Sequence, residues 1–158
     1  DLLYLDPPYN QHRYFTNYHV WETLVRWDQP EAYGVARKRA DAKEPQTASP
    51  YNRRREILPE LRRVLQGANA EMVAVSFNDE GWITREEMTT ALEDAGFSNV
   101  QVIEVDYPRY VGAKIGIHNP AGKKVGTVGK VRNREQVFLG GDAEMVAGAV
   151  AWGERIGL

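Results

Sequence analysis

Four consecutive residues near the start of the chain combine oxygen acceptors, rigidity and an aromatic ring. Asp6, Pro7, Pro8 and Tyr9 follow the apolar run of residues 2–5, which is typical of a buried parallel strand. Because each proline fixes its own φ and lacks an N–H, this turn offers acceptors and few donors. The Asp6 carboxylate and the Pro7 carbonyl would form a stiff acceptor pair at the carboxyl end of a strand, where open α/β sheets bind ligands.

An acceptor pair of this kind suits chemistry at an exocyclic amino group. The lone pair of such a nitrogen is delocalised into its ring, and acceptors on both hydrogens would draw the nitrogen towards a pyramidal, attacking geometry. They would also stabilise the positive charge that grows on the nitrogen during methyl transfer. The Tyr9 ring could stack on a base that has left its helix, a contact worth about 1–3 kcal/mol. The alternative is that two prolines end a strand, with Asp6 and Tyr9 incidental.

The elements that would position this turn follow an α/β pattern. Apolar spacing and end signals predict strands over residues 2–5, 72–77, 100–107 and 136–139, and helices over residues 19–28, 57–65, 84–95 and 142–152. This alternation favours a mostly parallel sheet covered by helices. Residues 29–52 hold three prolines, many charges and little periodicity, so a mobile loop is expected there.

Composition narrows the class of protein. A length of 158 residues with 42% hydrophobic residues suits one domain with a core, and a net charge of −2 gives no global sign of nucleic-acid binding. The chain has no cysteine, which excludes disulfides, thiol nucleophiles and cysteine zinc sites. No segment is long and apolar enough to span a membrane, so a cytoplasmic location is expected.

The motif of residues 6–9 resembles the catalytic motif of amino-directed, S-adenosylmethionine-dependent methyltransferases, and its neighbours narrow that resemblance. Residues 10, 12–14, 17–19, 22–23 and 26–28 look like the DNA adenine methylase family, the Dam-like adenine-specific group. Residues 76–81 resemble the family's turn after the next strand. Arg109 and Tyr110, with the glycine-rich loop of residues 112–132, are a weaker match.

The resemblance implies a site-specific DNA methyltransferase, such as the modification enzyme of a restriction–modification system. It would move the methyl group of S-adenosylmethionine to the amino group of a flipped adenine in double-stranded DNA. Asp6 and Pro7 would hold the amino group, Pro8 would shape the turn and Tyr9 would stack on the base. Asp6 would also approach the methionine part of the cofactor. The resemblance and the basic loop together give the candidate DNA-binding residues, which are Asn10, Arg13, Tyr14, Asn17, Tyr18, His19, Asn78, Arg109, Tyr110, Lys123 and Lys124.

The implied fold is α/β, the second half of a Rossmann-like class I methyltransferase fold, with a mostly parallel sheet and an antiparallel edge strand. The family's glycine-rich cofactor loop and target-recognition region precede the catalytic motif, and neither pattern occurs in this sequence. We therefore expect residues 1–158 to be the catalytic half of the domain. Its partner would be the missing N-terminal half or a self-associating copy, since residues 2–5 would form an open sheet edge.

Several alternatives stay open at this stage. Residues 13–19 could simply pack, and Asn78 could be an ordinary turn former. The arginines of residues 53–55 fit a solvated helix face, while the proposed chemistry needs no metal and no ligand cluster suggests one. Five large side chains are expected in the core, namely Trp21, Leu24, Trp27, Trp82 and Phe97. The rival functions are an RNA guanine-amino methyltransferase, and an inactive or split fragment that needs a partner.

Overall fold

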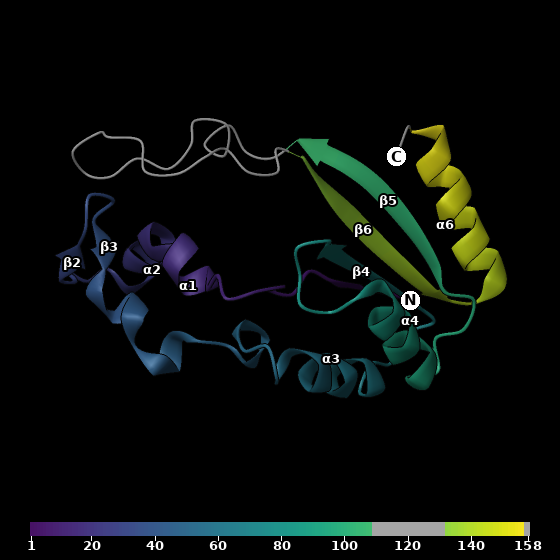
Figure 1. Ribbon diagram of the computed structural model, residues 1–158, viewed down its shortest axis with the longest axis horizontal. Helices are drawn as coiled ribbons and strands as arrows, with labels where there is room; N and C mark the ends of the chain where they lie inside the picture. Colours follow the sequence, from purple (N-terminus) through teal and green to yellow (C-terminus); the bar gives the residue numbers. More distant parts are fainter. Residues whose placement is uncertain (109–131, 157–158) are drawn as a thin grey trace.

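Four described strands form one sheet, which lies with its helices at one end of the molecule's long axis (Figure 1). The computed structural model describes residues 1–108 and 132–156. The sheet has the order β1 (Leu2–Leu5), β4 (Met72–Asn78), β6 (Arg132–Gly141) and β5 (Gln101–Pro108). β1 and β4 are parallel, whereas β6 is antiparallel to both β4 and β5. Three of these strands therefore run in one direction, and β6 runs against them.

The α/β prediction is confirmed, but two details of the predicted sheet are wrong. Among the described strands of this sheet only β1 and β4 pair in parallel, and the reversed strand lies between β4 and β5 instead of at an edge. The physical reason is the apolar end of β6, where Phe138 and Leu139 point to opposite faces and are 1% and 5% exposed. A strand that is apolar on both faces needs a packing layer over each face, and α4 (Arg85–Asp94) and α6 (Ala143–Arg155) provide these layers where β6 lies.

Helices cover both faces of this sheet. On one face, α3 (Ile57–Gln66) and α4 (Arg85–Asp94) pack against β4 and β6. This main core consists of Ile57, Leu61, Leu65, Val73, Val75, Phe77, Ile83, Met88, Ala91, Leu92, Phe97 and Phe138. On the other face, α6 (Ala143–Arg155) places Val146 against Met72, Ala74 and Leu139. A capping box starts α4, because the side chains of Thr84 and Glu87 each accept the other's backbone N–H.

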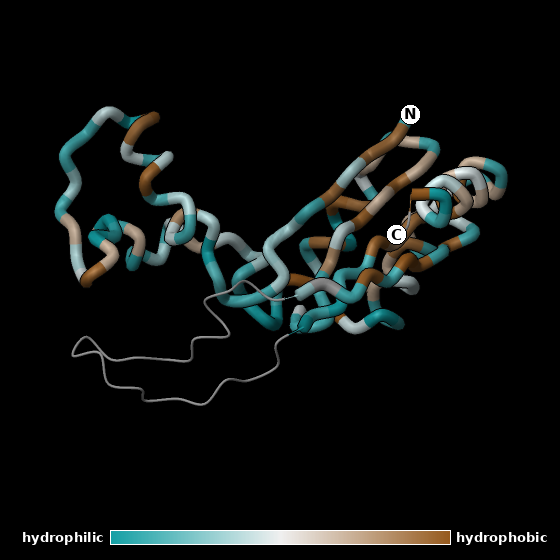
Figure 2. Tube along the Cα trace, turned by 90° about the horizontal axis from the view of Figure 1, so that it is seen from above, coloured by the Kyte–Doolittle hydropathy of each residue, from teal (hydrophilic) through white to brown (hydrophobic). Residues whose placement is uncertain are grey.

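We call residues 6–9 the acceptor turn. The segment after it, residues 10–52, forms a separate lobe at the other end of the molecule's long axis (Figure 1). It contains α1 (Tyr14–Asn17), α2 (His19–Arg26), the β2 (Ala32–Tyr33) and β3 (Lys38–Arg39) hairpin, and the short 3-10 helices η1 (Ala40–Lys43), η2 (Pro45–Thr47) and η3 (Pro50–Asn52). Figure 2 shows the lobe standing away from the sheet as a thin arm. Residues 29–52 thus hold short regular elements where only a loop was expected, and their mobility stays a prediction.

The exposed fractions of the five side chains predicted in the core contradict part of that prediction. Trp82 and Phe97 do pack in the main core. Trp21, Leu24 and Trp27, however, are 63%, 52% and 85% exposed. They lie on or just after α2, a helix of eight residues whose outer apolar side is covered by no other described element. No helix among the described residues is long and apolar enough to cross a membrane.

The junction between β6 and α6 depends on a glycine, which gives a stability prediction. Gly141 has φ +147°, and a Cβ there would meet the Glu71 carbonyl oxygen and lie 3.0 Å from the Met72 Cα. Gly141→Ala is expected to lower the free energy of unfolding in urea by about 1–3 kcal/mol, because the strained backbone cannot relax away from β4.

Gly148→Ala is the matched control for this change. Gly148 lies inside α6, and nothing comes within 4 Å of a Cβ built there. This variant should gain about 0.5–1 kcal/mol from the better helix propensity of alanine. Equal effects of the two changes would contradict the role given to Gly141.

Candidate functional site

The acceptor turn lies at the carboxyl end of β1, as predicted. The Asp6 side chain is exposed, while Pro7 and Pro8 are half-buried. A pocket of about 230 Å³ opens beside them, lined by Tyr4, Leu5, Asp6, Pro7, Pro8, Tyr51 and Leu61. The structure therefore places Asp6 and Pro7 on the wall of a cavity large enough for part of a ligand.

The Tyr9 ring lies between this turn and the sheet. It is half-buried against the main core, with its ring centroid 6.0 Å from that of Phe77 at an interplanar angle of 73°. The Tyr9 carbonyl accepts the Trp82 backbone N–H at 3.1 Å. These contacts join the turn after β1 to the turn after β4, so Tyr9 is a fixed ring at the edge of the site.

Tyr14 of α1 stands beside Asp6, and Tyr18, between α1 and α2, packs on Tyr14. The Tyr14 hydroxyl donates to the Asp6 backbone carbonyl at 3.0 Å. Its ring meets the Tyr18 ring edge-on, with centroids 5.9 Å apart. Burial first, and then the negative charge of Asp6, raise the pKa of Tyr14. The hydroxyl therefore stays protonated as a donor at neutral pH.

Side chains from the end of the lobe anchor the loop that leaves the acceptor turn. The Asn52 amide donates to the carbonyls of Asn10 and His12, at 3.0 Å and 3.1 Å. Asn10 also accepts the His12 backbone N–H through its side chain at 2.9 Å. The Arg13 guanidinium donates to the Glu44 carbonyl at 2.8 Å and to the Thr47 hydroxyl at 3.0 Å. The predicted site residues Asn10 and Arg13 thus hold the loop in place.

The sequence does not predict Asn52 and Thr47 as site residues, because both lie in the segment where a loop was expected. One local signal was present for Asn52. Ser49 precedes Pro50 and stands three residues before Asn52, which is the spacing of a helix-start motif. The Ser49 hydroxyl accepts the Tyr51 N–H, and Asn52 accepts the Ser49 N–H, both at 3.2 Å.

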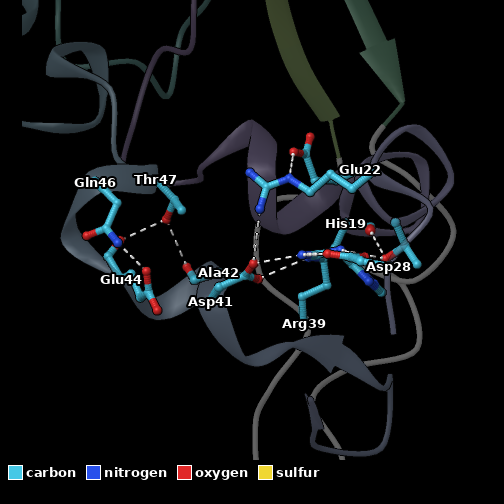
Figure 3. Close-up of polar contacts among 11 residues, drawn as sticks. His19, Glu22, Asp28, Arg39, Asp41, Ala42, Glu44, Gln46 and Thr47 are labelled. Atoms are coloured by element: carbon cyan, nitrogen blue, oxygen red, sulfur yellow. Dashed lines mark hydrogen bonds and ion pairs between the residues drawn. The ribbon is translucent and has the colours of Figure 1, made fainter. Parts of the chain in front are cut away.

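A charged cluster around Arg39 holds the lobe together (Figure 3). Arg39 is only 2% exposed, and its guanidinium donates to both carboxylate oxygens of Asp28 at 2.6 Å and 2.7 Å. It also contacts both oxygens of Asp41, at 3.0 Å and 2.8 Å, and the Thr23 hydroxyl at 3.2 Å. These bonds raise the pKa of Arg39 and hold the pKa values of Asp28 and Asp41 below their ordinary value.

The remaining predicted DNA-binding residues differ in their surroundings. Asn17 and Tyr18 are exposed, and His19 is half-buried with its carbonyl bound by the Thr23 hydroxyl at 2.9 Å. Asn78 is 2% exposed, donates to Glu135 at 2.5 Å and accepts the Glu80 backbone N–H at 2.8 Å. Asn78 therefore behaves as a turn former, and its buried side chain belongs to the β4 turn.

Basic residues and metal ligands give little further information about the site. Arg109, Tyr110, Lys123 and Lys124 lie outside the described residues. The arginines of residues 53–55 are exposed, and Arg53 pairs with Glu56 at 2.9 Å, as a solvated face would. Within residues 1–108 and 132–156, no three His, Cys, Asp or Glu side chains form a group that could hold a metal ion.

Comparison with known proteins gives the same class of enzyme as the motif. The profile of the D12 class N6 adenine-specific DNA methyltransferases matches residues 1–91. The chain is 32% identical over 111 residues to the type II methyltransferase M.FokI of Planomicrobium okeanokoites, covering 70% of this chain and 17% of that protein. It is 31% identical over 111 residues to modification methylase StsI of Streptococcus sanguinis, covering 70% and 16%.

A third, shorter relative is also matched over only part of its length. The chain is 25% identical over 114 residues to the type II methyltransferase M.NlaIII of Neisseria lactamica, covering 72% of this chain and 32% of that protein. The chain therefore spans between about a sixth and a third of the length of these relatives. No solved structure matches the chain.

From the ion pairs of Arg39 we predict that acid lowers the stability of the lobe. The carboxyl pKa values of Asp28 and Asp41 lie below their ordinary value of 3.8 in the folded protein. Their contribution to stability is therefore complete above that value and is lost as the pH falls through the folded-state pKa. In a titration from about pH 5 to about pH 2, tryptophan fluorescence should report this change, since Trp21 and Trp27 lie in the lobe.

Circular dichroism of the helices packed on the sheet should change at a lower pH than the fluorescence. Arg39→Gln is the informative variant, because it removes the partner of both carboxylates and should abolish the separate acid transition. A fluorescence titration that is the same in wild type and Arg39→Gln would contradict this account.

Proposed function

The chain belongs to the D12 class N6 adenine-specific DNA methyltransferase family, and from this we propose that the full-length protein methylates the exocyclic amino group of adenine in double-stranded DNA. The observation that carries the proposal is the acceptor turn. Asp6 and Pro7 present a carboxylate and a carbonyl beside a pocket at the carboxyl end of β1. The names of the relatives support a modification enzyme of a restriction–modification system, and the DNA substrate is the argument for a cytoplasmic location.

In the proposed mechanism, Asp6 and Pro7 bind the two hydrogens of the amino group. Their oxygens make the nitrogen lone pair available and stabilise the positive charge that develops on it. After transfer, the methylated nitrogen gives up one proton to Asp6 or to water. Pro8 limits the conformations of Pro7, which keeps its carbonyl directed at the amino group.

The target base must leave the duplex to reach this turn. Tyr9 would stack on the flipped adenine, and its edge-on contact with Phe77 supports this role because the ring needs no reordering when a base arrives. Arg13 and Asn52 would keep the loop after Tyr9 in one conformation while DNA binds. The DNA contacts of Tyr14, Asn17, Tyr18 and His19 stay predictions.

The proposed cofactor is S-adenosylmethionine, which supplies an electrophilic methyl group when bound. The described residues fit one side of such a site. The exposed Asp6 carboxylate suits the ammonium of the methionine part, and the pocket next to it includes Tyr4, Leu5 and Tyr51. A pocket of about 230 Å³ holds only part of a molecule of that size, so the rest of the cofactor site would lie beyond the described residues.

The sheet also supports the finer fold proposal, the second half of a Rossmann-like class I methyltransferase fold. β1, β4 and β5 run in the same direction and β6 is reversed between two of them. The acceptor turn and the Asn78 turn follow neighbouring parallel strands, so both lie at the ligand-binding edge.

Removal of the Asp6 carboxylate tests the proposed chemistry. In the full-length protein, Asp6→Ala should lower kcat by about 100-fold or more, the scale seen when one group that stabilises developing charge is lost. Asp6→Asn keeps one acceptor oxygen without the charge, so its loss should be smaller. The measurement is methyl transfer to duplex DNA, with digestion to nucleosides to identify the methylated base.

Asp94→Asn is the matched control, since Asp94 is an exposed carboxylate at the end of α4, away from the acceptor turn. It should retain wild-type activity. Full activity of a folded Asp6→Ala protein would disprove the assigned site. Methylated guanine in RNA would favour the rival enzyme, and no methyl transfer by the full-length wild type would favour a non-catalytic role.

The free edge of β1 is the second part of the proposal. β1 pairs only with β4 among the described strands, and Leu2 and Tyr4 are 62% and 60% exposed on one face. Unpaired strand edges bind other strands. Two occupants fit this edge: a strand from another part of the same polypeptide, or a second copy of the chain.

The isolated chain of residues 1–158 is therefore expected to self-associate in light scattering. Tyr4→Lys places a charge on the exposed face of β1 and should shift the protein towards monomer. Val35→Lys is the control, because Val35 is 87% exposed but lies in the lobe. A stable monomer of the unmodified chain would rule out association through this edge.

A further inference from the structure

The Tyr14 hydroxyl touches the acceptor turn without being part of the proposed chemistry. It donates to the backbone carbonyl of Asp6 at 3.0 Å. We propose that Tyr14 is a positioning residue for methyl transfer, whose hydroxyl fixes the orientation of the acceptor turn. This inference rests on the proposed function, because it requires that Asp6 and Pro7 hold the amino group.

The two prolines leave few torsions to be fixed. Pro7 and Pro8 have fixed φ angles, and the ψ angles of Asp6 and Pro7 are restricted because each precedes a proline. The Asp6 carbonyl is part of the planar peptide that ends at the Pro7 nitrogen. A hydrogen bond that sets the direction of this carbonyl therefore sets the rotation of the peptide, and with it the relative placement of the two acceptors.

The two prolines of the turn cannot provide this hydrogen bond. Pro7 and Pro8 lack an N–H, so neither can donate to the Asp6 carbonyl. The Tyr14 hydroxyl, from farther along the chain, donates to it instead. The bond spans eight residues and closes the loop that carries Tyr9 and Asn10.

Tyr14 is itself held in place from both sides. Its neighbour Arg13 is tied to the Glu44 carbonyl and the Thr47 hydroxyl. The Tyr18 ring packs edge-on against the Tyr14 ring, and the Tyr18 backbone N–H donates to the Tyr14 carbonyl at 2.8 Å. The hydroxyl thus reaches Asp6 from an anchored helix start, which is what a positioning group requires.

Tyr14→Phe in the full-length protein is the direct test, since it removes only the hydroxyl. Because a misplaced acceptor affects the transition state, kcat should fall by about 10- to 100-fold while the KM for DNA stays within about twofold. Thermal unfolding is measured alongside to show that the variant is folded. Tyr33→Phe is the matched control: it removes the same atom from a tyrosine of the β2–β3 hairpin and should leave kcat unchanged.

Rescue by a replacement donor separates positioning from packing. 4-Aminophenylalanine in place of Tyr14 keeps an N–H donor at the end of the ring and should restore most of kcat. O-Methyltyrosine keeps the ring and the oxygen but has no donor, so it should behave as Tyr14→Phe does. If Tyr14→Phe proves unstable, comparison of the 4-aminophenylalanine and O-methyltyrosine proteins still tests the inference.

An unchanged kcat for folded Tyr14→Phe would overturn the inference. A raised KM at unchanged kcat would also overturn it, because Tyr14 would then contact DNA instead of the acceptor turn. Equal activities of the 4-aminophenylalanine and O-methyltyrosine proteins would do the same. Failure of wild type to form N6-methyladenine is a distinct result, since it overturns the proposed function and this inference together.

Discussion

The scarcity of backbone donors in the acceptor turn is the constraint on which the site depends. Pro7 and Pro8 make the turn stiff and rich in oxygen acceptors, but they also remove two backbone N–H donors from it. The structure supplies donors from other elements. The Tyr14 hydroxyl binds the Asp6 carbonyl, and the Trp82 N–H binds the Tyr9 carbonyl. The turn is thus fixed from the lobe on one side and from the β4 turn on the other.

The sheet and the lobe serve this turn in different ways. The parallel pairing of β1 with β4 places the acceptor turn next to the β4 turn, whose Asn78 is buried and bound to Glu135 on β6. The reversed strand β6 therefore also supports the edge of the sheet where Asp6 lies. The lobe acts through single side chains: Asn52 binds the Asn10 carbonyl beside the turn, and Arg13 ties the start of α1 to Glu44.

Much of this arrangement could be predicted from local patterns. The strands at residues 2–5 and 72–78 and the helices that begin at Ile57 and Arg85 follow from apolar periodicity and end signals. The placement of the acceptor turn at the end of a strand was also correct. In each of these cases the determining residues lie close together in the sequence.

Features that depend on distant partners could not be predicted in this way. Arg39 looks like one more charge in a polar stretch, and only the fold brings Asp28 and Asp41 to it. Periodicity shows that α2 has an apolar side, but it cannot show whether another element covers Trp21 or Leu24. The position of β6 likewise depends on which strands pair. The two parts of the molecule are consequently stabilised in different ways. Ionic contacts around a buried guanidinium dominate the lobe and apolar burial dominates the sheet, so cooling, which weakens hydrophobic burial, acts chiefly on the sheet.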